Sequence, residues 1–168
     1  MLYLIGVDHS VQHDGRAGYE DPTFKRLRDE FPTFLDGVAR SIGATVIAEE
    51  SNEDVLSKFE AKKSVAYTVA SQMNIKHLFC EPSNFEREQL GIKSTGNPDD
   101  FRKREDFWLK KLVTLKEERI LFILGAGHVE SFSERAENAG FSVDVAEAYY
   151  GKEYFPPLTL PQVDRLCR

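Results

Sequence analysis

Imidazole and carboxylate side chains directly follow several short apolar runs of this sequence. They are His9, Glu49, Glu50, Glu81 and His128. An imidazole can act as a general base towards water, and imidazoles with carboxylates can bind a divalent metal ion that activates water. These residue types favour hydrolytic chemistry, provided that the fold brings them to one place.

A glycine turn, Gly125-Ala126-Gly127-His128, follows the clearest of these runs. Gly125 and Gly127 let the backbone bend tightly and approach a ligand closely. The helix expected after the turn points N–H groups at that ligand, which favours an anion or a developing oxyanion. A dinucleotide-binding turn is not indicated, because Glu130 takes the place of its third glycine, and no Gly-Lys-Ser/Thr motif occurs.

The helix predicted at 99–116 carries a charged pair beside its apolar stripe. The stripe consists of Phe101, Trp108, Leu112 and Leu115. Glu105 falls at the missing position of the stripe, and Arg104 precedes it. Because a buried charge is costly unless it is paired or used, we expect both to point into the crevice of the site. Arg104 could hold a substrate carboxylate or an oxyanion; an ion pair that only fixes the helix is the alternative.

The elements that must position these residues are strands alternating with helices, the pattern of βαβ units. Strands are predicted at 2–7, 45–48, 77–80, 120–124 and 141–145. In a parallel sheet the residues that follow the strands share the carboxyl edge, where ligands bind. We therefore predict a single α/β domain, mainly a parallel sheet with helices on both faces. It spans 1–168, with a core at about 1–147 and an aromatic, proline-containing tail at 148–168.

Several local signals predict where helices begin and end. Pro32 is expected to divide the first helical segment into two helices. Ser51 and Asp54 resemble a capping box and are expected to open one helix that continues to Met73. Residues 83–98 are predicted to be a loop. The tail contains Tyr149, Tyr150, Tyr154 and Phe155, which we expect to cover the sheet edge, a dimer contact being the alternative.

Ordinary structural roles compete with the functional ones at each position. His9 or His128 alone is best explained as a strand-end residue that bonds loop backbone, but both together favour function. One of Glu49 and Glu50 is expected to be a solvated acid, and Glu81 could equally form the turn before Pro82.

The other two histidines are not expected at the site. His13 falls in a polar loop, and His77 begins its strand at the opposite edge. Cys80 is expected in the core, because its neighbours are apolar.

Composition narrows the class of protein. The net charge of -6 argues against a nucleic-acid partner. The two cysteines lack metal-type spacing and favour a reducing compartment. The apolar start is too short for a secretion signal, and no run could span a bilayer. We expect a cytoplasmic protein with no membrane partner.

Two Gly-x-x-His motifs, Gly6-Val7-Asp8-His9 and Gly125-Ala126-Gly127-His128, resemble those of the TraB/TIKI group. That group belongs to a superfamily with erythromycin esterase-like and ChaN-like proteins. Its members carry a glutamate at the end of the second strand, which Glu49 matches most simply. They also have an arginine–asparagine pair on a helix before the second motif, where this chain has Arg104-Glu105. The glutamate changes the charge at that substrate-facing position.

The resemblance implies a hydrolase of a peptide, ester or related bond. In a metal-dependent version, His9, Glu49 and His128 bind Mn²⁺, Co²⁺ or Zn²⁺, and Glu50 or Glu81 accepts the proton of the bound water. In a metal-free version, a histidine oriented by Glu49 is the general base.

Two other classes of function remain open. The crevice could be a binding module that holds a small anion or haem at the turn 125–128. Alternatively, Asp8 and His9 with nearby acids could bind a metal pair for phosphoester hydrolysis. The expected partners are a small-molecule or peptide substrate and possibly a second copy of the chain, since any lid over the site must be short or come from a second subunit.

Overall fold

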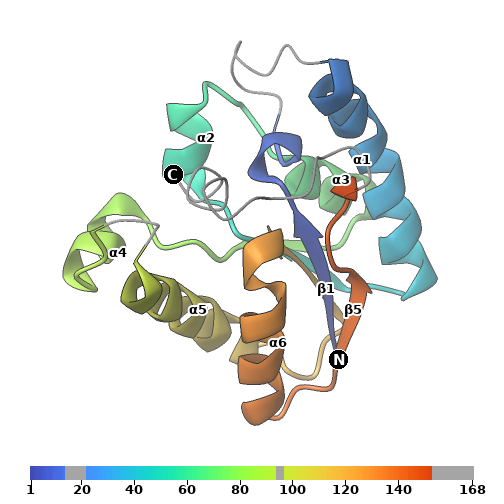
Figure 1. Ribbon diagram of the computed structural model, residues 1–168. Coiled ribbons are helices and arrows are strands. Elements are labelled where there is room, and N and C mark those ends of the chain that lie inside the picture. The colour runs from blue at the N-terminus through green and yellow to red at the C-terminus, as the bar shows by residue number, and fades with distance from the viewer. Residues whose placement is uncertain (14–21, 94–96, 153–168) are drawn as a thin grey trace.

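A single parallel sheet of five strands forms the centre of the protein, in the order β3-β2-β4-β1-β5 (Figure 1). The computed structural model describes residues 1–13, 22–93 and 97–152. The strands are β1 (Leu2–Val7), β2 (Val46–Glu49), β3 (Lys76–Phe79), β4 (Ile120–Gly125) and β5 (Val143–Glu147). The predicted α/β fold with a parallel sheet is confirmed, and every strand lies within two residues of its predicted bounds.

Helices cover both faces of the sheet (Figure 1). They are α1 (Pro22–Ser41), α2 (Glu53–Lys58), α3 (Val65–Met73), α4 (Asn84–Gln89), α5 (Pro98–Val113) and α6 (Val129–Asn138). On one face Leu35 of α1 and Val69 of α3 belong to one core. On the other, Trp108 of α5 and Phe132 of α6 belong to a second core. Because both faces are covered, the central strands are apolar apart from Glu49 at the end of β2.

Pro32 does not divide the first helix, since α1 runs from Pro22 to Ser41 without a break. A proline inside a helix removes one N–H hydrogen bond and crowds the preceding turn. The helix tolerates this cost because Phe31, Leu35 and Ala39 are fully buried around the proline. The prediction of two helices was wrong because apolar packing outweighs the local preference.

The segment 51–73 forms two helices rather than the one predicted. The side chains of Asn52 and Ser64 each accept a backbone N–H at a helix start, so α2 and α3 have separate N-caps. The predicted loop at 83–98 also contains a short helix, α4, which Ser83 begins with a complete capping box.

The strand order creates a divergence at the carboxyl edge. The chain leaves β1 and β2 towards the face of α1 and α3, and leaves β4 towards the face of α6. Because β4 lies between β1 and β2, neighbouring strands send their loops in opposite directions. In open α/β sheets, such a point is where ligands bind.

The domain continues past the predicted core boundary. The Tyr150 ring packs on Phe31 and Phe34 of α1, with ring centroids 5.0 and 4.7 Å apart, and its N–H bonds the carbonyl of Gly6. The predictions for Tyr154 and Phe155 fall outside the described residues.

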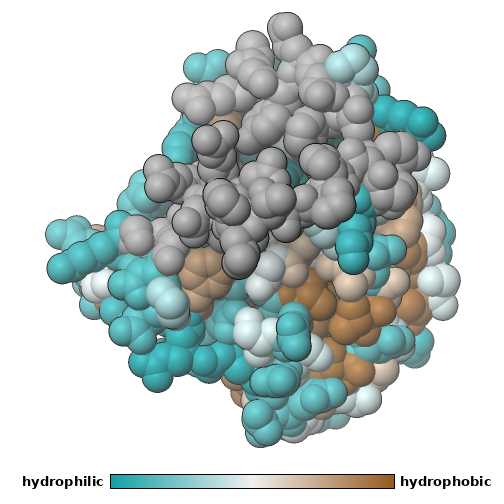
Figure 2. Space-filling view, in the orientation of Figure 1, coloured by the Kyte–Doolittle hydropathy of each residue, from teal (hydrophilic) through white to brown (hydrophobic). Residues whose placement is uncertain are grey.

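The hydropathy of the surface differs between the two sides of the face shown in Figure 2. In Figure 2, hydrophilic residues dominate over α4 and α5, whereas hydrophobic residues gather beside β5, where Val145 is 40% exposed. None of the helices in the described part of the chain combines the length and apolarity needed to cross a bilayer. A dimer contact stays a prediction.

Candidate functional site

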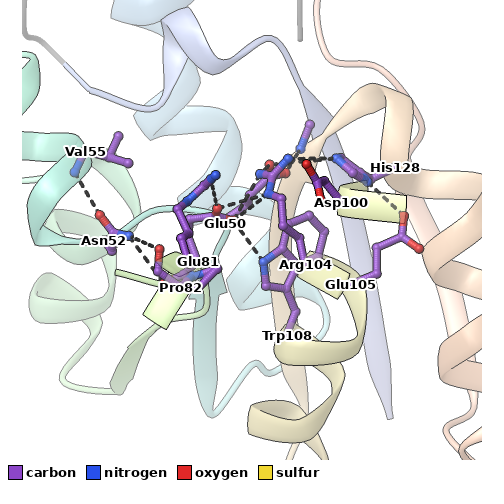
Figure 3. A network of polar contacts seen from close by, with 12 residues as sticks. Glu50, Asn52, Val55, Glu81, Pro82, Asp100, Arg104, Glu105, Trp108 and His128 are labelled. Atoms are coloured by element: carbon purple, nitrogen blue, oxygen red, sulfur yellow. Dashed lines mark hydrogen bonds and ion pairs between the residues drawn. The ribbon is translucent and has the colours of Figure 1, made fainter. Parts of the chain in front are cut away.

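Glu50 joins the ends of three strands at the carboxyl edge (Figure 3). Its carboxylate is buried and accepts the backbone N–H of Gly125 at 2.7 Å. The guanidinium of Arg104 pairs with it directly. His9 Nε2 and His128 Nε2 lie 3.5 and 3.9 Å from Glu50 Oε1. The structure therefore brings together the predicted residues His9, Glu50, Arg104 and His128.

These neighbours keep Glu50 ionised. Burial alone would raise the pKa of its carboxyl, because the charged form loses its hydration. The charge of Arg104, the N–H of Gly125 and the imidazoles of His9 and His128 in their protonated forms oppose that effect and lower the pKa to about 2. Glu50 is thus a fixed negative charge near neutral pH, and it is a poor acceptor for the proton of water.

Arg104 is the cation of a buried network. Its Nε atom donates to Glu81 Oε1 at 3.0 Å, and the indole N–H of Trp108 donates to the other oxygen of Glu81 at 3.0 Å. Arg87 pairs with the same carboxylate. Since Arg104 is 6% exposed and faces two carboxylates, the structure contains the ion pair that sequence analysis gave as its alternative role.

Both ring nitrogens of His128 face polar partners in the buried network. Its Nδ1 atom donates to Glu105 Oε1 at 2.8 Å, because an ionised carboxylate can only accept. Its Nε2 atom lies 3.4 Å from Arg104 Nη1, a group that can only donate. The ring stacks on Phe101 with centroids 4.3 Å apart and is buried. Its lone pair is therefore occupied by the guanidinium.

The partners of Glu105 explain why a charged residue occupies the apolar stripe of α5. Besides His128, its carboxylate accepts from Ser131 Oγ at 2.6 Å and pairs with Arg135 Nε at 2.9 Å. The buried charge is fully satisfied by α6, so it fixes α5 to α6 and orients His128.

His9 differs from the rest of this network in being open to solvent. Its side chain is 45% exposed, whereas those of Arg104 and His128 are 7% and 4% exposed. It opens the 3₁₀ helix η1 (His9–Val11), which Asp8 caps by accepting the N–H of Ser10. Its Nδ1 atom donates to Gln12 Oε1 at 2.7 Å. Its Nε2 atom faces Glu50 and the solvent.

The glycines of the two motifs are required for space rather than for bending. A Cβ on Gly125 would lie 2.9 Å from His9 Nε2 and 3.3 Å from Glu50 Oε2, and one on Gly6 would meet the carbonyl oxygen of Ala148 at 2.1 Å. The φ of Gly125 is −57°, which any residue can adopt. Gly127 faces open space, with no atom near its added Cβ.

Glu49 is not brought to this cluster. It is fully buried on the other side of β2, where its Oε1 atom accepts from Ser64 Oγ and from His77 Nε2, the latter at 2.6 Å. Successive strand residues point to opposite faces, so Glu49 and Glu50 part at the end of β2. The predicted trio of His9, Glu49 and His128 is therefore not assembled.

The described residues include no group of three or more His, Cys, Asp or Glu side chains arranged to hold a metal ion. The guanidinium of Arg104 lies against both Glu50 and His128, and its charge would repel a divalent cation there. Asp8 is used as the cap of η1. These contacts weaken the metal-dependent version and the phosphoester alternative alike.

Sequence reasoning missed four residues that shape the region: Gln12, Ser64, His77 and Arg87. Gln12 had a usable signal, because it lies three residues after His9 and can meet it across one tight turn. His77, set aside as remote, does stay out of the Glu50 cluster but pairs with Glu49. Cys80 is buried in the core, as predicted, and burial raises the pKa of its thiol.

Comparisons of this chain with protein-family models, with curated proteins and with solved structures found no match. The resemblance to the TraB/TIKI group thus rests on the two Gly-x-x-His motifs, on the glutamate that ends the second strand and on Arg104.

Proposed function

We propose that this protein is a hydrolase in which His9 is the general base that activates water, without a metal ion. The observation that carries the proposal is the close approach of an exposed imidazole to a buried carboxylate, ionised near neutral pH, at the divergence of the strands. His9 can reach substrate, while Glu50 cannot leave its position. The resemblance to the TraB/TIKI group supports the same class of reaction.

The division of roles follows from the hydrogen bonds. Gln12 fixes the proton of neutral His9 on Nδ1, which leaves the Nε2 lone pair for a water molecule. The water oxygen attacks the carbonyl carbon of an ester or amide while Nε2 takes its proton. Glu50 then stabilises the imidazolium as its counter-ion. When the tetrahedral intermediate collapses, His9 returns that proton to the leaving group.

The turn after β4 is the best candidate for stabilising the oxyanion. Gly127 is exposed and a substrate can approach its backbone closely, and the N–H groups at the start of the following helix are suited to negative charge. His128 and Arg104 do not contact substrate in this mechanism, because their polar atoms already face Glu105, Glu50 and Glu81. They hold the turn and Glu50 in place.

The proposal is tested with panels of chromogenic esters and fluorogenic peptides on the wild type and on His9→Gln. His9 is half-exposed, so this variant should fold normally. Loss of general-base catalysis should lower kcat/KM by about 10²- to 10⁴-fold. Glu88→Gln, an exposed residue of α4, serves as the matched control and should retain full turnover. Full turnover by His9→Gln would refute the proposed mechanism.

Two further measurements separate the alternatives. Turnover should survive a strong chelator, and calorimetric titration with Mn²⁺, Co²⁺ or Zn²⁺ should show no stoichiometric site. Activity that is lost on chelation and restored by one of these ions would replace the metal-free mechanism with the metal-dependent one. An unreacted anion or haem that copurifies with the protein, with no turnover of either panel, would favour the binding module.

A further inference from the structure

Gln12 contacts the proposed base through its side chain and the start of α3 through its backbone. Its side-chain oxygen faces His9 Nδ1 at 2.7 Å, and the residue is only 4% exposed. Turning the amide by 180° would exchange its oxygen and its nitrogen. With the oxygen towards His9, the ring carries its proton on Nδ1. With the NH₂ group there, Nδ1 would have to accept, and the proton would move to Nε2.

Only one of these two arrangements suits the proposed chemistry. A ring protonated on Nε2 donates towards Glu50 and has no lone pair for water. A ring protonated on Nδ1 keeps Nε2 free. The orientation of a buried amide therefore decides whether His9 can act as a base, and something must hold that orientation.

Several buried polar atoms at the ends of β1 and β2 are unpaired among the residues that the structure describes. They include Ser10 Oγ, Gln12 Nε2, Glu49 Oε2 and Ser51 Oγ, none of which has a hydrogen-bond partner. Gln12 Nε2 is a donor without an acceptor, and Glu49 Oε2 is an acceptor without a donor. The two serine hydroxyls can each donate and accept.

The backbone ties these atoms to one region. The carbonyl of Gln12 accepts the N–H of Val65, and His13 forms a bridge with Ser64. The hydroxyl of Ser64 in turn donates to Glu49. Gln12 and Glu49 thus both adjoin the first residues of α3, and the carboxylate of Glu49 is fully buried.

We propose that Gln12 is a positioning residue for His9 and that the buried charge of Glu49 sets its orientation. In a low-dielectric interior a carboxylate attracts the NH₂ end of an amide dipole. That attraction turns Gln12 Nε2 towards Glu49 and leaves its oxygen towards His9. This inference rests on the proposed function, because the tautomer of His9 affects catalysis only if His9 is the general base.

The test is the tautomer of His9, read from two-bond ¹H–¹⁵N NMR correlations of ¹⁵N-histidine-labelled protein near pH 8, without substrate. The wild type should be predominantly protonated on Nδ1. Glu49→Gln keeps the shape and removes the charge, and it should bring the two tautomers to comparable populations. Glu88→Gln should leave the wild-type pattern. Adding Gln12→Glu to Glu49→Gln should restore the Nδ1 proton, because a carboxylate at position 12 can only accept.

An unchanged His9 tautomer in Glu49→Gln would overturn the inference. If that variant fails to fold, Glu49→Asp should give a smaller shift in the same direction, and no shift would overturn the inference equally. A shifted tautomer in a protein that hydrolyses nothing would refute only the proposed function. Hydrolysis that depends on His9, with an unmoved tautomer, would refute only the role of Gln12 and Glu49.

Discussion

The two sides of β2 differ in how completely their buried polar groups are paired. On the α5 side, Glu50, Glu81 and Glu105 each meet a guanidinium, and each also accepts from a further group. On the α3 side, only one oxygen of Glu49 is bonded, and the hydroxyls of Ser10 and Ser51 have no partner in the described chain.

We call the paired network of Glu50, Glu81, Glu105 and their guanidinium partners the frame. The incompletely paired residues on the α3 side are called the adjustable side. A fully paired network in a low dielectric is rigid, because moving any member leaves another charge exposed to an apolar interior. On the incompletely paired side hydrogen bonds do not fix every side chain, so the orientation of Gln12 depends on the charge of Glu49 in our proposal. His9 stands between the two, touching Glu50 of the frame through Nε2 and Gln12 of the adjustable side through Nδ1.

Removing the cation of the frame should have the largest effect. Arg104→Met leaves Glu50 and Glu81 buried without their shared partner, and it should lower the free energy of unfolding by about 3–5 kcal/mol. Denaturant titration at pH 7 measures the change. Arg40→Met is the matched control, because Arg40 forms only an exposed pair with Asp36, and it should leave the midpoint unchanged. Equal midpoints for Arg104→Met and wild type would show that the network is not a frame.

Acid should lower the free energy of unfolding by protonating Glu50 of the same frame. Its pKa of about 2 lies below the 4.5 of an unpaired glutamate, so folding favours the ionised form. The resulting stabilisation is complete above about pH 4.5 and is lost as the pH falls towards 2. Its full size is on the order of 3 kcal/mol.

Urea titrations at pH 5, 4, 3 and 2 check this against Glu50→Gln, which cannot titrate at that position. The wild type should lose on the order of 3 kcal/mol more than the variant over this range. Parallel losses in the two proteins would mean that Glu50 is not the group that makes the frame sensitive to acid.

The sheet and the position of the site could be predicted from the sequence, because both depend on local patterns. Apolar runs give the strands, and residues that follow parallel strands must share an edge. Pairing at a distance could not be predicted. Whether Glu49 or Glu50 faces Arg104 depends on which residue is the last of β2, and a shift of one residue reverses the side chains.

The helix boundaries show the same limit. Pro32 and Ser51 carry strong local signals, yet buried neighbours keep α1 continuous and other residues cap α2 and α3. The role of Arg104 was undecided between substrate and ion pair, since sequence does not show that Glu50 and Glu81 both reach it.

The smallest effects should come from two serines on the adjustable side. Ser64→Ala removes the N-cap of α3 and the donor to Glu49, and it should lower the free energy of unfolding by about 1–2 kcal/mol. Ser51→Ala removes a buried hydroxyl that has no partner in the described chain, so it should be neutral or slightly stabilising. Both residues are almost fully buried, and denaturant titration of the pair therefore compares a bonded with an unbonded hydroxyl at matched exposure. A loss in Ser51→Ala as large as that in Ser64→Ala would mean that the α3 side is as tightly paired as the α5 side, and the contrast between the frame and the adjustable side would fail.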